Sequence, residues 1–248
     1  MRILNVRVDE IDMNAALAEI SAAVATKEQA RFFHVVTLNA EGIYMAQHDA
    51  EFLTVIENAG LVTPDGNGVL WAARQMNVNL PERVTGIDLI HALCAKGAKK
   101  SWRIYLLGGK PGIAEEASKA LQGTYPGIEI CGVHDGYFHS QAEDEEQVIT
   151  DIAAQKPDIL LVGMGMPFQE KWLAANAGRL NVAVAIGVGG SFDVIAGRIK
   201  RAPKLWQKLK LEWLWRVFLE PKRIKRIMVL PLFMWKVVTS RRSSVASR

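Results

Sequence analysis

The sequence predicts an α/β protein with a mostly parallel sheet covered by helices on both faces. Apolar runs recur along the chain and alternate with segments of helical spacing, the order expected of strand–helix–strand units. The runs are apolar throughout, as strands buried on both faces are. Half of the 248 residues are hydrophobic, which is enough for one large domain with a sizeable core.

The predicted elements follow one another from near residue 30. Strands are predicted over residues 30–38, 101–109, 126–138, 157–165 and 181–190. Helical spacing is found from Ala40 onward, over residues 111–123 and over residues 142–156. Several runs stop at glycine, where the chain can turn sharply into the next helix.

Polar residues and glycines gather where the apolar runs end. In an open parallel sheet, ligands bind at the carboxyl ends of the strands, so these residues are the first candidates for a site. They are Thr37, Asn39, Asp65, Gly108–Gly109, Asp135, Gly163–Gln169 and Gly189–Asp193.

Asp65 lies in "LVTPDGNGVLWAAR", between a short apolar run and a helix-compatible segment. Pro-Asp-Gly is ordinary turn chemistry and aspartate is a good helix N-cap, so local physics favours a turn or cap. The alternative is a carboxylate held at the mouth of a site.

Thr37 and Asn39 in "HVVTLNAEG" are likewise either site residues or structural ones. Because they are two residues apart in a predicted strand, their side chains point the same way, as a shared site would need. Asn39 could instead cap the next helix.

Two glycine-containing turns offer further candidates. Gly108 and Gly109 end a strand before a helix, where backbone N–H groups favour a phosphate, although a plain tight turn fits equally well. In "VGMGMPFQEKWLA", the amide of Gln169 suits sugar hydroxyls, and Glu170 is expected only to favour the helix dipole.

The sequence argues against a metal site and a cofactor. The five histidines form no HExxH pattern, and no Asp-x-Asp motif occurs. Cys94 and Cys131 are expected to be separate thiols in a reducing compartment. The N-terminus resembles neither a signal peptide nor a membrane anchor, so we expect a cytoplasmic protein.

The charge is divided unequally along the chain. Residues 198–248 carry 15 Lys and Arg against two acids, a net +13, whereas residues 1–197 carry the other 15 against 24 acids, a net −9. The basic segment is rich in tryptophan, and its uncharged run 227–235 is far shorter than the about 20 residues that span a bilayer. A helix lying on an anionic membrane surface fits best, a helix packed on the body is the alternative, and nucleic acid suits so apolar a tail less well.

We therefore divide the chain into three parts. They are an α/β body over residues 1–197, a basic amphipathic helical appendage over residues 198–240 and a loose tail over residues 241–248.

Eight motifs in order resemble one family. They are "TLNAEG", "TPDGNGVLWAAR", "RVTGIDLI", "YLLGGKPGIAEEA", "HDGYF", "VGMGMPFQEKW", "GVGGSFDVIAGRIKRAP" and "LEWLWRVFLEPKRIKR". Together they resemble the WecG/TagA/CpsF glycosyltransferases over nearly the whole chain. The resemblance implies a Rossmann-like catalytic domain with a membrane-associating appendage. It also implies a metal-independent, inverting transfer of a hexose from a UDP donor to a polyprenyl-diphosphate-linked sugar, at the inner membrane face.

The resemblance also assigns roles to residues of this chain. The family's general base falls on Asp65, and its polar pocket residues fall on Thr37, Asn39 and Gln169, with Asp193 near the nucleotide. Its appendage arginines fall on Arg216, Arg223 and Arg226, which would face a diphosphate.

Other readings stay open beside the transferase. The donated sugar is expected to be N-acetylmannosamine, with its uronic acid form and other hexoses as alternatives. A non-catalytic nucleotide-binding module that recruits a partner to the membrane would use the same glycine turns and tail. A dinucleotide-dependent oxidoreductase is disfavoured because the fingerprint glycines are absent. A homo-oligomer is possible.

Overall fold

In the computed structural model, the chain folds around the expected parallel sheet. The structure describes residues 1–26, 32–138, 142–203, 206, 212–219 and 228–246. The strands are β1 Arg2–Ile3, β2 Val6–Arg7, β3 Phe33–Leu38, β4 Leu61–Pro64, β5 Arg103–Gly108, β6 Glu129–His134, β7 Ile159–Gly163 and β8 Val184–Gly187. The helices are α1 Met13–Ala25, α2 Ala40–Ala46, α3 Ala50–Asn58, α4 Asn67–Gln75, α5 Gly86–Lys100, α6 Ile113–Thr124, α7 Ala142–Gln155, α8 Phe168–Asn176, α9 Ser191–Ile195, α11 Glu212–Leu219 and α13 Val229–Ala246.

The main sheet has six strands in the order β4-β3-β8-β7-β5-β6, and every neighbouring pair is parallel. All five predicted strands are present, each shorter than its apolar run, and Leu61–Pro64 adds the sixth. Because the strands are parallel, their carboxyl ends lie along one edge, where Leu38 pairs with Pro64 and Gly108 with Gly163. The two strands at the ends of the order, β4 and β6, are the outer strands.

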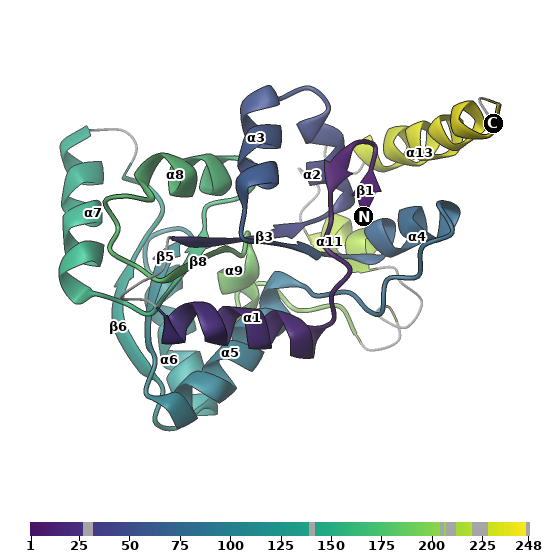
Figure 1. Ribbon diagram of the computed structural model, residues 1–248. Coiled ribbons are helices and arrows are strands. Elements are labelled where there is room, and N and C mark those ends of the chain that lie inside the picture. Colours follow the sequence, from purple (N-terminus) through teal and green to yellow (C-terminus); the bar gives the residue numbers. More distant parts are fainter. Residues whose placement is uncertain (27–31, 139–141, 204–205, 207–211, 220–227, 247–248) are drawn as a thin grey trace.

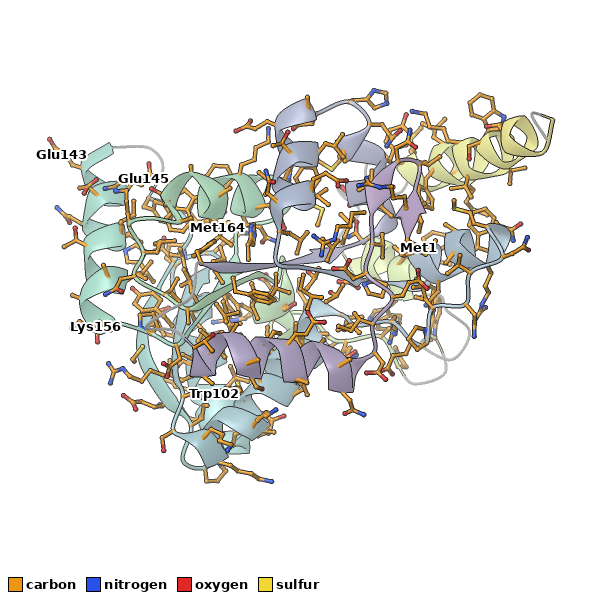
Figure 2. All side chains as sticks on the ribbon, in the orientation of Figure 1. Met1, Trp102, Glu143, Glu145, Lys156 and Met164 are labelled. Atoms are coloured by element: carbon orange, nitrogen blue, oxygen red, sulfur yellow. The ribbon has the colours of Figure 1, made fainter. Side chains whose placement is uncertain are left out.

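Helices cover both faces of the sheet, as predicted. One core cluster joins α1, α5, α6 and α9 to one face, and two further clusters join α2, α3 and α4, and α7 and α8, to the other. Figure 1 shows these layers, with α1, α5 and α6 below the sheet and α3 and α8 above it. Side chains fill the space between the layers, with Trp102 on the α5 side and Met164 on the α8 side (Figure 2).

The connections after β3 and β8 leave the carboxyl edge of the sheet on opposite faces. After β3 the chain enters α2 on one face, and after the neighbouring β8 it enters α9 on the opposite face. Adjacent strands whose connections diverge are where open α/β sheets bind ligands. The first ligand-binding candidate is therefore the region beyond β3 and β8.

The appendage contributes two described helices, α11 and α13. Phe233 and Val237 of α13 are buried in the same core cluster as α2 and α4, so this helix packs on the body. Pro231 lies in the first turn of α13, where proline is tolerated. The helix continues through residues 241–246, which the sequence analysis assigns to a loose tail. Within the described residues, no helix is both long and apolar enough to cross a bilayer.

Candidate active site

Four helices begin around the carboxyl ends of β3, β4 and β8. The first turns of α4 and α2 are so close that a Cβ on Gly68 would lie 2.9 Å from the Cβ of Ala40. Likewise, a Cβ on Gly86, the first residue of α5, would lie 3.3 Å from the Cα of Val188, just before α9. Helix N-termini carry partial positive charge, so their gathering makes this edge suited to anionic groups.

Asp65 lies at the centre of this gathering. Its backbone N–H donates to the Leu38 carbonyl at 2.9 Å, which ties the end of β4 to the end of β3. The residue at the N-cap of α4 is Gly66, which makes no side-chain cap. The Oδ2 of Asp65 accepts from the Gly86 N–H at 3.5 Å, at the start of α5. The half-buried carboxylate thus contacts the start of a helix other than the one that directly follows it.

The side chains of Thr37 and Asn39 both make hydrogen bonds within the protein. The Thr37 hydroxyl is buried and donates to the Gly187 carbonyl at 2.7 Å, linking β3 to β8. Asn39 is the N-cap of α2, because its Oδ1 accepts from the Gly42 N–H at 2.8 Å. The cap expected as the alternative for Asn39 is therefore present.

Gln169 is buried, with 1 % of its surface exposed. Its Oε1 accepts from the Gly165 N–H at 3.0 Å and from the Gly189 N–H at 3.1 Å. Its Nε2 donates to Glu170 Oε1 at 2.7 Å. The amide thus ties together the loops that follow β7 and β8.

Glu170 departs most from expectation. We expected a carboxylate that only complements the α8 dipole, but the residue is fully buried, and burial raises its pKa to about 7. Among the residues that the structure describes, its Oε2 has no hydrogen-bond partner. No local signal distinguishes this glutamate from an exposed first-turn acid, so sequence reasoning missed it.

Gly108 and Gly109 have structural reasons to be glycine. Their φ angles are +132° and +76°. A Cβ on Gly108 would lie 2.5 Å from the carbonyl carbon of Gly163, so β5 and β7 approach closely here. Gly109 N–H donates to the Gly163 carbonyl, and its own carbonyl accepts from Gly136 N–H, both at 3.0 Å.

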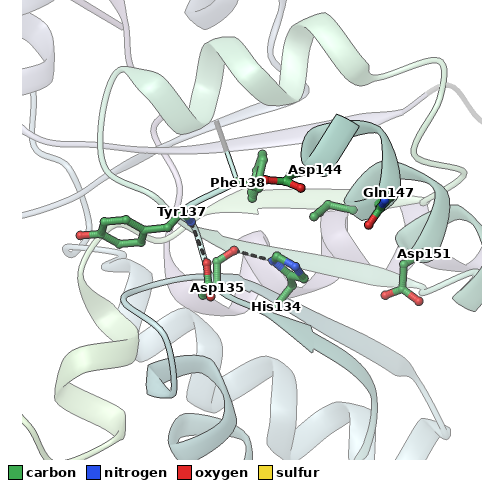
Figure 3. Close-up of a pocket in the computed structure, with 8 residues that line it drawn as sticks. His134, Asp135, Tyr137, Phe138, Asp144, Gln147 and Asp151 are labelled. Carbon is green, nitrogen blue, oxygen red and sulfur yellow. Dashed lines mark hydrogen bonds between the residues drawn. The ribbon is translucent and has the colours of Figure 1, made fainter. Parts of the chain in front are cut away.

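A cavity of about 420 Å³ lies beside β6 and α7 (Figure 3). Asp135 accepts from the Tyr137 N–H at 2.8 Å, and its carbonyl oxygen lies 2.8 Å from His134 Nδ1. The cavity is lined by His134, Asp135, Tyr137, Phe138, Asp144, Gln147, Val148 and Asp151.

The predicted site residues therefore fall into two groups along the carboxyl edge. Asp65, Asn39 and Gln169 belong to the β4–β3–β8–β7 end, whereas Gly108–Gly109 and Asp135 belong to the β5–β6 end. From β4 to β5 there are four strand spacings of ~4.8 Å, about 19 Å in all. The structure does not bring the two groups into one cluster of touching side chains.

Asp193 and the arginines complete the predicted set. Asp193 is a half-buried residue in the first turn of α9, and its carbonyl accepts from the Ile199 N–H at 3.0 Å. Arg216 lies in α11. The predictions for Arg223 and Arg226 fall outside the described residues.

The first residues of the appendage are held to the body by two ion pairs. Arg201 pairs with Asp88 at 2.7 Å, and Asp88 also accepts from the Thr85 hydroxyl that caps α5. This Thr-x-x-Asp capping box is visible in the "RVTGIDLI" motif, although we did not single it out. Arg198 pairs with Glu116 of α6. The root of the appendage thus contacts the same helix whose first N–H reaches Asp65.

Comparison with known proteins decides the family. Residues 1–246 match the family model described as "Glycosyl transferase WecG/TagA/CpsF family". The chain belongs to this family. Similar proteins from Staphylococcus aureus strains NCTC 8325 / PS 47, COL and MRSA252 are each 34 % identical over 240 residues, which cover 97 % of this chain and 92 % of the relative. Each is named N-acetylglucosaminyldiphosphoundecaprenol N-acetyl-beta-D-mannosaminyltransferase.

The WecG/TagA/CpsF resemblance inferred from the eight motifs is therefore confirmed. The protein is a glycosyltransferase, so the hypothesis of a dinucleotide-dependent oxidoreductase is rejected. Within the described part of the chain, no cluster of three or more His, Cys, Asp or Glu side chains could hold a metal ion.

Proposed function

We propose that the protein transfers a hexose, first of all N-acetylmannosamine, from a UDP donor to N-acetylglucosamine linked to a polyprenyl diphosphate. The printed name of the relatives contains both the sugar and the acceptor. The proposal further states that the transfer is inverting and independent of metal. The products would serve cell-surface polymers such as teichoic acid or exopolysaccharide.

The position of Asp65 carries the proposal. It follows the parallel strand β4 at the carboxyl edge of the sheet, its backbone N–H donates to the Leu38 carbonyl at the end of β3, and its Oδ2 accepts from the Gly86 N–H at the start of α5. An inverting transfer needs one base that removes the acceptor hydroxyl's proton while that oxygen attacks the anomeric carbon. UDP then leaves from the opposite face of the sugar. A half-buried carboxylate at a ligand-binding edge suits this role.

The leaving UDP needs positive charge. The first turns of α2, α4 and α5 converge at this edge, so their N–H groups favour an anionic group there. We propose that Arg216, Arg223 and Arg226 of the appendage add the charge that a metal supplies in other transferases.

The outer face of α13 supports an anionic membrane surface as a partner. Leu232, Trp235 and Val238 follow one side of the helix and are 49 %, 65 % and 39 % exposed, opposite the buried Phe233 and Val237. A basic segment with an exposed tryptophan face suits the membrane interface, where the lipid-linked acceptor is held. We propose that the protein works on the inner face of the cell membrane.

Replacing Asp65 by asparagine tests the base directly. The variant keeps the size and an oxygen that can accept from Gly86 N–H but cannot take a proton. Turnover should fall by about 100-fold or more, while UDP binding changes little. Asp158→Asn is the matched control, because Asp158 is a buried aspartate at the amino edge of the same sheet, where its Oδ2 accepts from Arg103 N–H.

The assay uses UDP-sugars, an N-acetylglucosamine-diphosphate-polyprenol acceptor and a chelator. Unchanged turnover in Asp65→Asn would overturn the base assignment, and turnover lost on chelation would overturn metal independence. The alternative function, a nucleotide-binding module that recruits a partner to the membrane, predicts UDP binding without UDP release from any donor.

A further inference from the structure

Gln169 occupies an unusual place among the candidate site residues. Its single amide oxygen receives two backbone N–H groups, from Gly165 and Gly189, which lie in separate loops after β7 and β8. Both glycines have left-handed φ angles, +84° and +54°, and a Cβ on either would meet no atom of the described residues within 4 Å. The Gln169 oxygen is therefore a side-chain link between the two loops.

A glutamine amide can hold this position only in one orientation. If it rotated by half a turn, the Nε2 hydrogens would face the two donating N–H groups. Glu170 prevents this rotation, because its Oε1 accepts from Gln169 Nε2 at 2.7 Å. Glu170 is fully buried, and no described residue offers a hydrogen-bond partner to its Oε2.

The sheet leaves space for the pair at Gly187. A Cβ there would lie 2.6 Å from Gln169 Nε2 and 2.7 Å from Glu170 Oε1, closer than side chains tolerate. The carbonyl of the same Gly187 accepts a hydrogen bond from the Thr37 hydroxyl. The Gln169–Glu170 pair is therefore packed against the carboxyl end of β8.

We infer that Glu170 is a positioning residue of the transferase. It fixes the orientation of the Gln169 amide, and the amide in turn holds the Gly165 and Gly189 loops at the edge of the site. Glu170 acts through Gln169 and touches no substrate. The expected effect on kcat/KM rests on the proposed transfer at this edge. How firmly the two loops are held can be measured by amide exchange, without any transfer assay.

The variants Glu170→Gln and Glu170→Met separate this role from core filling. Glutamine keeps an oxygen that can accept from Gln169 Nε2, whereas methionine fills the space but leaves Nε2 without an acceptor. Residue-resolved amide exchange by NMR should show the Gly165 and Gly189 amides exchanging about tenfold faster in Glu170→Met, the loss of about one hydrogen bond, and near the wild-type rate in Glu170→Gln. The value of kcat/KM should follow the same order.

The opposite order would overturn the inference, because a merely apolar requirement favours methionine over glutamine in a buried position. If Glu170→Met does not fold, the wild-type protein still decides: the Gln169 side-chain amide protons should be protected from exchange. Exchange of those protons at the rate of a solvent-exposed amide would also overturn it. If no donor sugar is transferred, the proposed function fails, yet the exchange rates still test Glu170.

Discussion

Replacing Glu170 by glutamine should change how stability depends on pH. Burial is the main cause that raises the pKa of this carboxyl group from 4.5 to about 7, and the hydrogen bond from Gln169 offsets it only in part. The folded state therefore binds the proton more tightly than the unfolded state. Its stabilising contribution is complete below pH 4.5 and is lost as pH rises through about 7. At 1.36 kcal/mol per pH unit, this interval corresponds to about 3 kcal/mol.

Other titratable groups around α8 must be separated from this effect. His34 on β3 is buried, and burial lowers its pKa from 6.5 to about 4, so its contribution grows as pH rises through that range and opposes that of Glu170. On the α3 side, Lys171 pairs with Asp49 and Glu51. The hydrogen bond between Lys171 and Asp49 lowers the pKa of Asp49 from 3.8 and raises that of Lys171 from 10.5, outside the interval. All four groups are present in both proteins, so they cancel in the difference.

The assay is urea denaturation of the wild type and Glu170→Gln from about pH 4.5 to about pH 8. The difference in unfolding free energy should shift towards the glutamine variant by about 3 kcal/mol across this range and then level off. Glu51→Gln is a control on the neighbouring α3, since the Glu51 side chain is 71 % exposed. A difference in unfolding free energy that stays constant with pH, or that shifts towards the wild type, would refute the inference that burial holds the Glu170 carboxyl group neutral.

Substitutions at three further residues, with their controls, test other parts of the structure. Gly187→Ala should destabilise the fold by about 1–3 kcal/mol in thermal or urea unfolding, because its Cβ overlaps the Gln169–Glu170 pair, and unchanged stability would contradict that packing. Asn39→Ala should lose about 0.5–2 kcal/mol with the α2 cap, whereas Asn39→Asp should keep it; a large loss of activity in Asn39→Asp alone would indicate that the amide contacts substrate. Trp235→Glu should weaken sedimentation with anionic vesicles, whereas Tyr137→Glu should not, because Tyr137 is similarly exposed (60 % against 65 %) but lies on the body; equal effects would contradict a special role of α13.

The sequence was enough to predict the kind of fold and the edge of the sheet that matters. Runs that are apolar throughout predict strands buried on both faces, and the structure confirms a parallel sheet with helices on each side. The order of the strands could not be predicted, because it depends on long-range pairing that no local pattern encodes. That order decides which strand ends meet, and it separates Gly108–Gly109 from Asp65.

Local patterns do not reveal partners that are distant in sequence. Pro-Asp-Gly favoured a cap or turn for Asp65, and the structure adds a contact from the Gly86 N–H, 21 residues later. Glu170 was expected only to favour the helix dipole, yet it is fully buried in space that Gly187 leaves for it. In the tryptophan-rich appendage, Trp215 is half-buried and donates to the Lys200 carbonyl at 3.0 Å, a contact that its local sequence does not indicate.

Thr37 and Gln169, which the family resemblance places in the pocket, make hydrogen bonds that join parts of the fold. Both residues are buried, and these hydrogen bonds join strands or loops. Loss of activity on truncating either residue would therefore not identify a sugar contact. For Thr37, serine keeps the hydroxyl that donates to Gly187, and valine keeps the shape without it. If the hydroxyl only joins β3 to β8, activity and stability should fall together in Thr37→Val and survive together in Thr37→Ser. A fall in kcat/KM with unchanged stability would instead place this hydroxyl against the substrate.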